Sequence, residues 1–499
     1  MRVTFPNPLG PPITVDTAYL SNLKERLPRN ASILPSLQRR PHFRILLVII
    51  GFIIIFTIHP RPPFPPNYSI EWRQEATLPQ IKGDISVGEG KNGRYVKFDV
   101  PRGTGFNHQV SRKLDAESQW VSTNSTLYDD RLQHHLAVLG NRSLAFEPYV
   151  EDDTYLPFAI SRWPWRSARI PLSAYISTVI SGFEKFYRSP RAVPAQYYRN
   201  VCPSYKEQLH TIVNDNRPQG DLELVADGQS RIHQIQVLLA GSEENCVRII
   251  GEPFDDEFFD SKASLDLYET FVKSPVMKHF TFSPTVLSII NRALPILSPE
   301  SQPYDIEAIS QATSQDVHKT TVWKHILAMH LRRGKDWEQV CEEKGRRAAP
   351  FVSFNKLPLL PGNENVPPPS TMVEATRMGL YKAKCLPETL DIIARARRMR
   401  KNHPLLKSIY LLTDLGENDE GGWINEIKMW LQSEGWDNVF LGKNDLYNRH
   451  QDKELGVAVD MEIARRAGVF VGNGFSTTTS NIVLLRSRDG IHPDLTQFW

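Results

Sequence analysis

The sequence predicts an α/β fold, because strand-like and helix-like segments alternate through most of the chain after residue 84. Several apolar runs end in glycine-containing turns that open into a helical pattern, which is typical of parallel strands joined by helices. The chain has 499 residues, of which 40% are hydrophobic, so it is long enough for roughly two or three domains. In such sheets, ligands bind at the carboxyl ends of the strands.

A first domain is predicted over residues 84–310. Tyr95–Val100 has the alternation of a strand and is followed by a glycine-bearing turn at residues 101–109. A helix is expected to run through Leu132–Val138, and Ser143–Phe146 is the next expected strand. This succession is the beginning of a βαβ unit.

A second domain is predicted over residues 311–499, after a polar segment with two prolines that we interpret as a linker. Residues 357–370 hold five prolines and are expected to form a loop. The other elements alternate again, with strands expected at Val322–Leu331, Ser408–Thr413, Val439–Leu441 and Val469–Val471, and helices at Pro387–Lys401, Trp423–Glu434, Val459–Ala467 and from Ser476 onward.

A membrane anchor is predicted at residues 45–58, an apolar run without a charged residue. As a helix these residues span about 21 Å, less than the roughly 30 Å of a hydrocarbon core. A buried core helix or a cleaved signal segment is therefore the alternative. The run has no polar face and begins far from Met1, which favours an anchor.

Charge predicts the orientation of this anchor. Residues 1–44 hold seven Lys and Arg but only two Asp and Glu, so the positive-inside rule places them in the cytosol. We expect a single-pass type II protein of the Golgi or endoplasmic reticulum membrane, because a short anchor suits a thin membrane. Residues 1–44 would be a disordered cytosolic tail, residues 59–83 a proline-rich stem, and the rest would be lumenal. The whole chain has a net charge of only +3, which argues against nucleic-acid binding.

Two further features agree with a lumenal location. N-glycosylation sequons beyond the anchor begin at Asn67, Asn124 and Asn141. All four cysteines also follow the anchor, which predicts two disulfides in an oxidising compartment, with four buried free thiols as the alternative. The sequence leaves the connectivity open, and our favoured pairs are Cys202 with Cys246 and Cys341 with Cys385.

Three glycine-marked turns are candidate binding sites. In the first, Gly105 permits a tight turn and Asn107 offers a hydrogen bond to a sugar hydroxyl. The alternative is a plain connection between a strand and a helix.

The second turn, at residues 330–337, has the sequence HLRRGKDW after an apolar run. A guanidinium makes planar, bidentate contacts with phosphate oxygens, and a glycine lets backbone and ligand approach closely. Arg332 follows the strand directly and is the expected phosphate ligand, whereas strand alternation turns Arg333 to the opposite side. Asp336 would orient Arg332, and His330 would meet a ribose or base. Surface and capping charges are the alternative.

The third turn follows the strand Val469–Val471 and contains Gly472 and Asn473, after which Ser476 and Thr477 open a helix. Free backbone N–H groups and the helix dipole favour an anion there, and hydroxyl groups add donors. A capping residue without a ligand is the alternative. Two anion sites in one α/β domain fit a diphosphate.

Motifs that the sequence lacks argue against several classes of enzyme and metal site. The sequence has no Asp-x-Asp pair to hold a metal against a diphosphate, so arginine and helix N-termini would have to neutralise a leaving diphosphate. It also lacks the G-x-x-x-x-G-K-[ST] loop of an ATPase and the C-x-x-C and H-E-x-x-H zinc motifs.

The second and third turns resemble a known family. His330-Leu331-Arg332, Gly334, Asp336-Trp337 and Cys341 are similar to the H-L-R-x-G-x-D-W-x-x-x-C motif of GDP-fucose protein O-fucosyltransferases. Residues 459–473 resemble that family's V-D…A-x-x-F-I-G-N segment, and residues 105–109 its N-terminal glycine turns. The resemblance covers roughly residues 95–490.

The resemblance implies a GT-B fold of two facing Rossmann-like domains, with the acceptor side in residues 84–310 and the nucleotide sugar mainly in residues 311–499. It implies that Arg332, supported by Asp336, holds the β-phosphate and assists the departure of GDP. The other implied donor contacts are Asn107, Gly105 and Phe106 near the fucose, Gly472, Asn473, Ser476 and Thr477 near the diphosphate, and His330, Asp414 and Asp460 near guanosine.

We therefore expect an inverting transfer of fucose from GDP-fucose to a hydroxyl acceptor, a protein Ser or Thr foremost, without a metal or cofactor. The sequence departs from the family at Thr478, where the family has phenylalanine, and at Thr104, where one branch has its proposed glutamate base. Another nucleotide sugar, a glycan acceptor, or a non-catalytic lumenal binding protein are the rival interpretations.

Overall fold

The structure is a computed structural model with two compact units, Met1–Phe64 and Pro65–Trp499. It describes Arg2–Phe5, Ile13–Asp16 and residues 66–499 apart from residues 84–88, 100–122, 151–153, 155, 160–165, 178–189, 214–221, 225–226, 298–320, 362–368, 414, 416–421 and 448.

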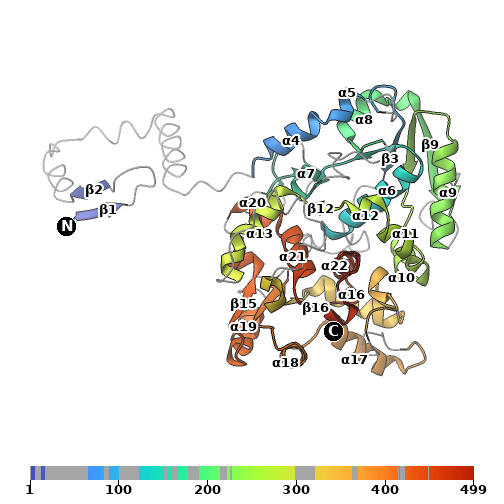
Figure 1. Ribbon diagram of the computed structural model, residues 1–499. Coiled ribbons are helices and arrows are strands. Elements are labelled where there is room, and N and C mark those ends of the chain that lie inside the picture. Colours follow the sequence, from blue (N-terminus) through green and yellow to red (C-terminus); the bar gives the residue numbers. More distant parts are fainter. Residues whose placement is uncertain are drawn as a thin grey trace, which may run out of the picture. The chain divides into compact units, whose positions relative to one another are not determined.

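The first unit contains an antiparallel pair of short strands, β1 (Arg2–Phe5) and β2 (Ile13–Asp16) (Figure 1). Both lie in the segment that we expected to be a disordered tail. The predicted anchor, residues 45–58, lies outside the described residues. Within the described ranges, no helix is both long and apolar enough to cross a membrane.

The second unit begins in the predicted stem, part of which is helical instead. Helices α4 (Ser69–Ala76) and α5 (Pro79–Lys82) follow Pro66, and Pro79 is the first residue of α5. The buried Tyr68 just before α4 donates from its hydroxyl to Glu454, with an oxygen–oxygen distance of 2.8 Å. This segment is therefore ordered by long-range packing. Its proline content alone does not reveal that packing.

Two parallel sheets lie in separate parts of this unit (Figure 1). The first has the strand order β10-β9-β11-β3-β4-β8, and every neighbouring pair is parallel. Its strands are β3 (Tyr95–Asp99), β4 (Ser143–Phe146), β8 (Val193–Pro194), β9 (Glu207–Val213), β10 (Leu222–Glu223) and β11 (Cys246–Ile250). The expected strands at Tyr95 and Ser143 are confirmed.

Helices and short turns connect these strands. The helix predicted through Leu132–Val138 is confirmed as part of α6 (Thr123–Leu139). The other helices of this half are α7 (Leu172–Tyr175), α8 (Ala195–Val201), α9 (Gly228–Gly241), α10 (Asp256–Asp260), α11 (Tyr268–Val272), α12 (Pro275–Lys278) and α13 (Pro284–Leu297). Two small antiparallel pairs join β5 (Tyr149–Val150) to β6 (Arg169–Ile170) and β7 (Ile176–Ser177) to β12 (Thr281–Phe282).

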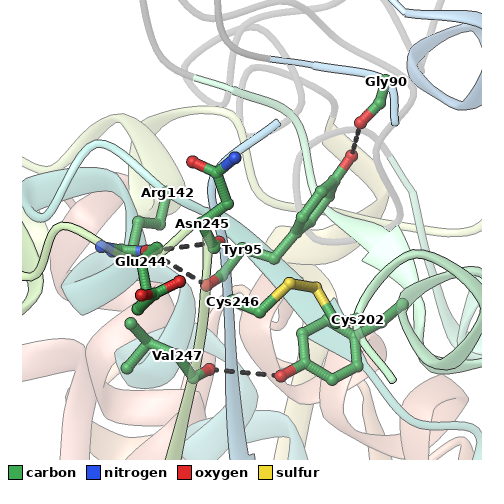
Figure 2. Close-up of a disulfide and its surroundings, with 9 residues drawn as sticks. Gly90, Tyr95, Arg142, Cys202, Glu244, Asn245, Cys246 and Val247 are labelled. Carbon is green, nitrogen blue, oxygen red and sulfur yellow. Dashed lines mark hydrogen bonds between the residues drawn. A yellow bond between two sulfur atoms is a disulfide. The ribbon is translucent and has the colours of Figure 1, made fainter. Parts of the chain in front are cut away.

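The favoured pairing of Cys202 with Cys246 is confirmed, with Cα atoms 5.6 Å apart (Figure 2). This disulfide joins the end of α8 to the first residue of β11, beside the buried rings of Tyr95 and Tyr198. Arg142, which begins the approach to β4, donates to the carbonyl oxygens of Glu244 at 2.8 Å and Asn245 at 3.2 Å. These contacts fix the amino ends of β3, β4 and β11.

The second sheet has the order β15-β14-β13-β16-β17 and is also parallel throughout. Its strands are β13 (Ile326–His330), β14 (Ser408–Leu412), β15 (Asn438–Leu441), β16 (Val469–Gly472) and β17 (Thr496–Phe498). Its helices are α16 (Lys335–Arg346), α17 (Glu374–Cys385), α18 (Thr389–Asn402), α19 (Trp423–Ser433), α20 (His450–Glu454), α21 (Gly456–Arg466) and α22 (Thr477–Arg488).

Both faces of this sheet are buried, as side-chain alternation requires. Leu327 and Met329 of β13 belong to a core shared with residues of α18 and α19. Ile326 and Ala328 belong to the larger core, which includes residues of α21 and α22. The strand therefore directs successive side chains to two different layers of helices.

Most predicted elements of this half are confirmed, with differences at their ends. β13 begins at Ile326 rather than Val322, because Thr321–His325 forms a 3₁₀ turn. α18 begins at Thr389 rather than Pro387, since Glu388 and Asp391 form a capping box there. Helices α16 and α17 and strand β17 were not predicted from the sequence.

The two sheets are joined through helices within the second unit. Arg131 of α6 donates to Asn481 of α22, and Arg488 of α22 donates to the carbonyl oxygens of Met277 and Phe280, each at 2.9 Å. α13 also packs against α21. The structure thus confirms an α/β fold with parallel sheets, while the predicted boundary near residue 310 lies outside the described residues.

Candidate functional site

The second and third glycine turns lie side by side because β13 and β16 are parallel neighbours. Met329 pairs with Val471 in their register, so both strands end at the same edge of the sheet. His330 ends β13, and Asn473 follows β16. Two predicted anion-binding segments are thereby brought to adjacent carboxyl ends, where ligands bind in this class of sheet.

A buried hydroxyl group couples the two turns directly. Nδ1 of His330 lies 2.9 Å from Oγ1 of Thr479, and the same Oγ1 accepts the backbone N–H of Asn473 at 3.0 Å. Burial, with a contribution from the nearby Arg332 charge, lowers the pKa of His330 to about 3. The imidazole is therefore neutral at working pH and acts as a polar spacer between β13 and α22.

Arg332 is held next to an aromatic ring rather than in solvent. Its side chain is 7% exposed, and its guanidinium carbon lies 4.1 Å from the ring centroid of Trp337. Gly334 between them has φ +107°, a backbone conformation that favours glycine, and it is the N-cap residue of α16. A cation against an aromatic face retains its charge while losing conformational freedom, as a preorganised anion ligand requires.

A single carbonyl oxygen connects this arginine segment to the third turn. The carbonyl of Cys385 accepts from Trp337 Nε1 at 3.1 Å and from Asn473 Nδ2 at 2.7 Å. The favoured disulfide between Cys341 and Cys385 is confirmed, with Cα atoms 5.9 Å apart. It fixes the residue that provides this carbonyl, so the disulfide supports both turns.

Arg333 occupies the opposite side, as strand alternation predicted. Its Nη2 donates to the carbonyl of Pro387 at 2.6 Å, and its guanidinium carbon lies 4.3 Å from the ring centroid of Trp423. These contacts tie β13 to the starts of α18 and α19. Arg333 is accordingly structural, whereas Arg332 packs on Trp337, whose indole N–H shares the Cys385 carbonyl with Asn473 of the third turn.

The start of α22 has the properties of an anion site, because no side chain among the described residues caps its N-terminus. Ser476 is the N-cap residue but its side chain makes no capping hydrogen bond. The residue is 1% exposed, and its Oγ has no hydrogen-bond partner among the described residues. The first N–H groups of a helix lack intrahelical partners. A simple capping role, the alternative from sequence, is therefore not what the structure shows.

Close packing at Gly472 explains why the turn needs glycine there. A Cβ at this position would lie 2.3 Å from Cγ2 of Thr479, closer than real contacts allow. We expect Gly472→Ala to lower the free energy of unfolding by about 1–3 kcal/mol, because Thr479 and the turn must shift. Thermal unfolding of the variant tests this prediction.

Gly379→Ala in α17 is the matched control, because nothing lies within 4 Å of the added Cβ. Alanine replaces glycine inside a helix there, so this variant is expected to be neutral or about 0.5–1 kcal/mol more stable. Equal unfolding temperatures for the two variants would contradict the steric account of Gly472.

Asp460 of α21 lies in a pocket of tyrosines. Its Oδ1 accepts a hydrogen bond from Tyr410 at 2.5 Å and another from Tyr447. Gly442, which follows β15, provides the space, because a Cβ there would collide with all three side chains. Burial raises the pKa of Asp460 to about 7, although both tyrosine hydrogen bonds oppose the shift.

This raised pKa predicts a pH dependence of stability. The folded state keeps the Asp460 proton up to about pH 7, whereas the unfolded chain loses it near its ordinary value of 3.8. Because the folded state binds more protons in between, the contribution of Asp460 to the unfolding free energy falls as pH rises from about 4 to about 7. Asp460→Asn should show a shallower decline in chemical denaturation over this range. Parallel curves for the two proteins would contradict the assignment.

The remaining predicted residues are partly outside the described structure. Gly105, Phe106, Asn107 and Asp414 lie outside it, as does the side chain of Asp336. Thr477 is the first residue of α22 and is partly exposed.

The three sequon asparagines occupy different environments. Oδ1 of Asn67 accepts the N–H of Ser69 at 2.9 Å, and Asn141 is exposed with φ 52°. Asn124 lies in α6, and its side chain is outside the described part. Their use as glycosylation sites stays a prediction.

Sequence reasoning missed the residues that hold the turns in place. The Cys385 carbonyl, Thr479 and Asn355 contribute through hydrogen bonds between segments far apart in the chain. The run of hydroxyl residues at 476–480 was a signal for Thr479. Neither spacing nor composition distinguishes Asn355.

Comparison with known proteins identifies the region that contains this site. Residues 288–488 match the family described as GDP-fucose protein O-fucosyltransferase. This part of the chain belongs to that family. The predicted family is thereby confirmed, and the matched region includes Arg332, Asp460 and the start of α22. The match supports a GDP-fucose-dependent glycosyltransferase.

Solved structures show a broader likeness. The chain is similar over 81% of its length to POFUT1 in complex with GDP-fucose, with 17% identity, 97% of that chain covered and a TM-score of 0.48. For POFUT1 in complex with GDP, 81% of this chain and 98% of that chain are covered, with 15% identity and a TM-score of 0.46. For the apo form of POFUT1, 81% of this chain and 97% of that chain are covered, with 16% identity and a TM-score of 0.46. No curated protein sequence matches the chain significantly.

Proposed function

We propose that the protein transfers fucose from GDP-fucose to a hydroxyl group, with a Ser or Thr side chain of a protein as the acceptor. The family match over residues 288–488 supports GDP-fucose as the donor. The observation that carries the site assignment is the start of α22, where the buried Ser476 hydroxyl has no partner among the described residues. This hydroxyl and the adjoining N–H groups suit a diphosphate.

In this proposal Arg332 and the start of α22 jointly bind the two phosphates of GDP-fucose. The two segments are linked through His330 with Thr479 and through the Cys385 carbonyl. As the bond between fucose C1 and the β-phosphate oxygen breaks, negative charge grows on GDP. Arg332 and the helix start would stabilise that charge, and their fixed positions avoid a reorganisation cost at that moment.

The acceptor oxygen forms the new bond to C1 from the opposite face, so the anomeric configuration inverts. The acceptor hydroxyl gives up its proton to solvent water in the same step. Thr104, where one branch of the family has its proposed glutamate base, lies outside the described residues. The proposal therefore places donor activation, rather than a particular base, in the described site.

We further propose that the reaction needs no metal ion. No group of three or more His, Cys, Asp or Glu side chains able to hold a metal occurs in the described part of the chain. Neutralisation would then depend on arginine and the helix dipole. Full turnover in EDTA is the expected result, and restoration of activity by Mn²⁺ or Mg²⁺ after chelation would contradict it.

We also propose a domain arrangement and a cellular location for the protein. The two parallel sheets suit a GT-B arrangement, with guanosine contacted by His330, Asp414 and Asp460. The basic excess before residues 45–58 supports a type II anchor and a lumenal site in the Golgi or endoplasmic reticulum. The two disulfides agree with an oxidising compartment.

Nucleotide specificity tests the proposed donor. Thermal unfolding of the full-length protein should rise in temperature with GDP and GDP-fucose and stay unchanged with UDP and UDP-sugars, because a bound ligand stabilises the folded state. Stabilisation by UDP-sugars instead would indicate the same fold with another donor. No response to any nucleotide would indicate a non-catalytic binding protein.

A further inference from the structure

Asn355 lies in the short 3₁₀ turn Ser353–Lys356, between α16 and α17, and touches the start of α22 from outside the matched motifs. We infer that Asn355 is a positioning residue for the diphosphate, acting by aligning the backbone of the turn between β16 and α22. This inference rests on the proposed function, since it assigns to Asn355 the orientation of the same anion site.

The side-chain amide of Asn355 holds two carbonyl groups of that turn. Its Nδ2 donates to the carbonyl oxygens of Gly474 at 2.9 Å and Ser476 at 3.1 Å. The residue is 2% exposed, and both carbonyls belong to the turn that leads into α22. A primary amide nitrogen carries two hydrogens, so Nδ2 can satisfy both acceptors at once, and this fixes the amide orientation.

These two bonds help to fix where the backbone N–H groups point, together with the N–H of Ser480, which donates to the same Ser476 carbonyl at 3.1 Å. In a trans peptide unit the C=O and the N–H point to opposite sides. A carbonyl of Ser476 directed at Asn355 therefore turns the N–H of Thr477 away from Asn355. That N–H belongs to the first residue of α22 and has no intrahelical acceptor. Asn355 thus keeps carbonyl oxygens, which would repel an anion, on the side away from the donors.

Neighbouring contacts make Asn355 rigid. The N–H of Val352 also donates to the Gly474 carbonyl at 3.0 Å. The ring of Phe351 lies 5.1 Å from that of Phe475, and a Cβ on Gly474 would meet Phe351 at 2.4 Å. The 3₁₀ turn and the turn between β16 and α22 therefore pack tightly against each other. Asn355 is thereby held in a fixed position relative to the two carbonyl groups that it contacts.

Stability alone does not account for an asparagine at this position. Its Oδ1 is buried and has no hydrogen-bond partner among the described residues. A buried acceptor in that condition costs free energy. The unsatisfied Oδ1 lowers stability, while both Nδ2 hydrogens bind carbonyls of the turn between β16 and α22. This combination fits a functional role for the amide.

Calorimetric titration of the full-length protein with GDP and with guanosine tests the inference. Asn355→Ala is expected to raise the Kd for GDP about tenfold, since two hydrogen bonds that align the turn are lost, and to leave the Kd for guanosine unchanged. Asn355→Asp keeps the shape but replaces the donors by acceptors, so it should weaken GDP binding at least as much.

Ser480→Ala is the matched control. The Ser480 hydroxyl accepts the N–H of Phe354 at 3.1 Å, so its loss removes one buried hydrogen bond between the same two segments without touching the two turn carbonyls. This variant should lower the unfolding temperature and keep the wild-type Kd for GDP.

The outcomes separate the two proposals. If wild-type protein does not bind GDP, the proposed function fails and the inference fails with it. If wild type binds GDP but both Asn355 variants bind it equally well, the inference alone is wrong. An equal loss of GDP and guanosine binding in both variants would also contradict it, because it would show general damage to the nucleotide site.

Discussion

Arg332→Ala is expected to lower the turnover of GDP-fucose by about 10²–10³-fold, the typical cost of removing one preorganised donor from a developing negative charge. The guanidinium is buried against Trp337. Its neighbours His330 and Trp337 are linked to the third turn and α22 through Thr479 and the Cys385 carbonyl. Release of GDP from GDP-fucose by the purified full-length protein measures the effect. Arg332→Lys should recover only part of the loss, because an ammonium lacks the planar fork.

Arg333→Ala is the control for this experiment. Arg333 is the adjacent arginine, yet it contacts Pro387 and Trp423 on the other face of the sheet. Its removal should cost some stability and leave turnover within a few-fold of wild type. Undiminished turnover in Arg332→Ala, or an equal loss in both variants, would contradict the assignment of the phosphate ligand.

Replacing Cys341 and Cys385 together by serine is expected to destabilise the protein strongly. The two residues are separated by 44 positions, and a disulfide closing a loop of that length stabilises by about 4 kcal/mol in the chain-entropy account. Because the Cys385 carbonyl holds both Trp337 and Asn473, the variant should also bind GDP more weakly. Denaturant unfolding and GDP titration measure the two consequences separately.

The other disulfide provides a control of the same loop length. Cys202 and Cys246 are also 44 positions apart but lie beside the first sheet, away from the two glycine turns. Their joint replacement by serine should lower stability comparably and leave GDP affinity close to wild type. A comparable loss of GDP affinity in both double variants would show that the Cys385 carbonyl has no special part in the site.

Local patterns predicted the elements of the second sheet well. Val469–Val471 and Ser408–Thr413 are apolar runs long enough to be buried strands, and both appear nearly as expected. The start of β13 was wrong because Val322 and Trp323 are apolar but belong to a 3₁₀ turn. Apolar character marks burial, and burial is shared by strands and turns.

Segments that depend on distant partners were not predictable. The helix α4 forms in a stretch taken for a stem, where Tyr68 and Glu75 contact Glu454 and Ser173. These contacts join residues that are 386 and 98 positions apart in the chain. These contacts cannot be predicted from the local sequence.

The same distinction applies to the candidate site. Glycine, arginine and hydroxyl residues after strands identified the two turns, since those residue types are needed wherever an anion meets backbone. Alternation also separated Arg332 from Arg333. The supporting atoms, such as the Asn355 amide and the Cys385 carbonyl, were not predictable, because their roles depend on positions fixed only by the folded chain.

The central claim is that Arg332 and the start of α22 hold the diphosphate of GDP-fucose. A crystal structure of the protein with bound GDP tests it most directly. We predict β-phosphate oxygens within hydrogen-bond distance of the Arg332 guanidinium, and phosphate oxygens at the Ser476 hydroxyl and the first N–H groups of α22. GDP bound elsewhere, or with its phosphates directed away from both groups, would contradict the account.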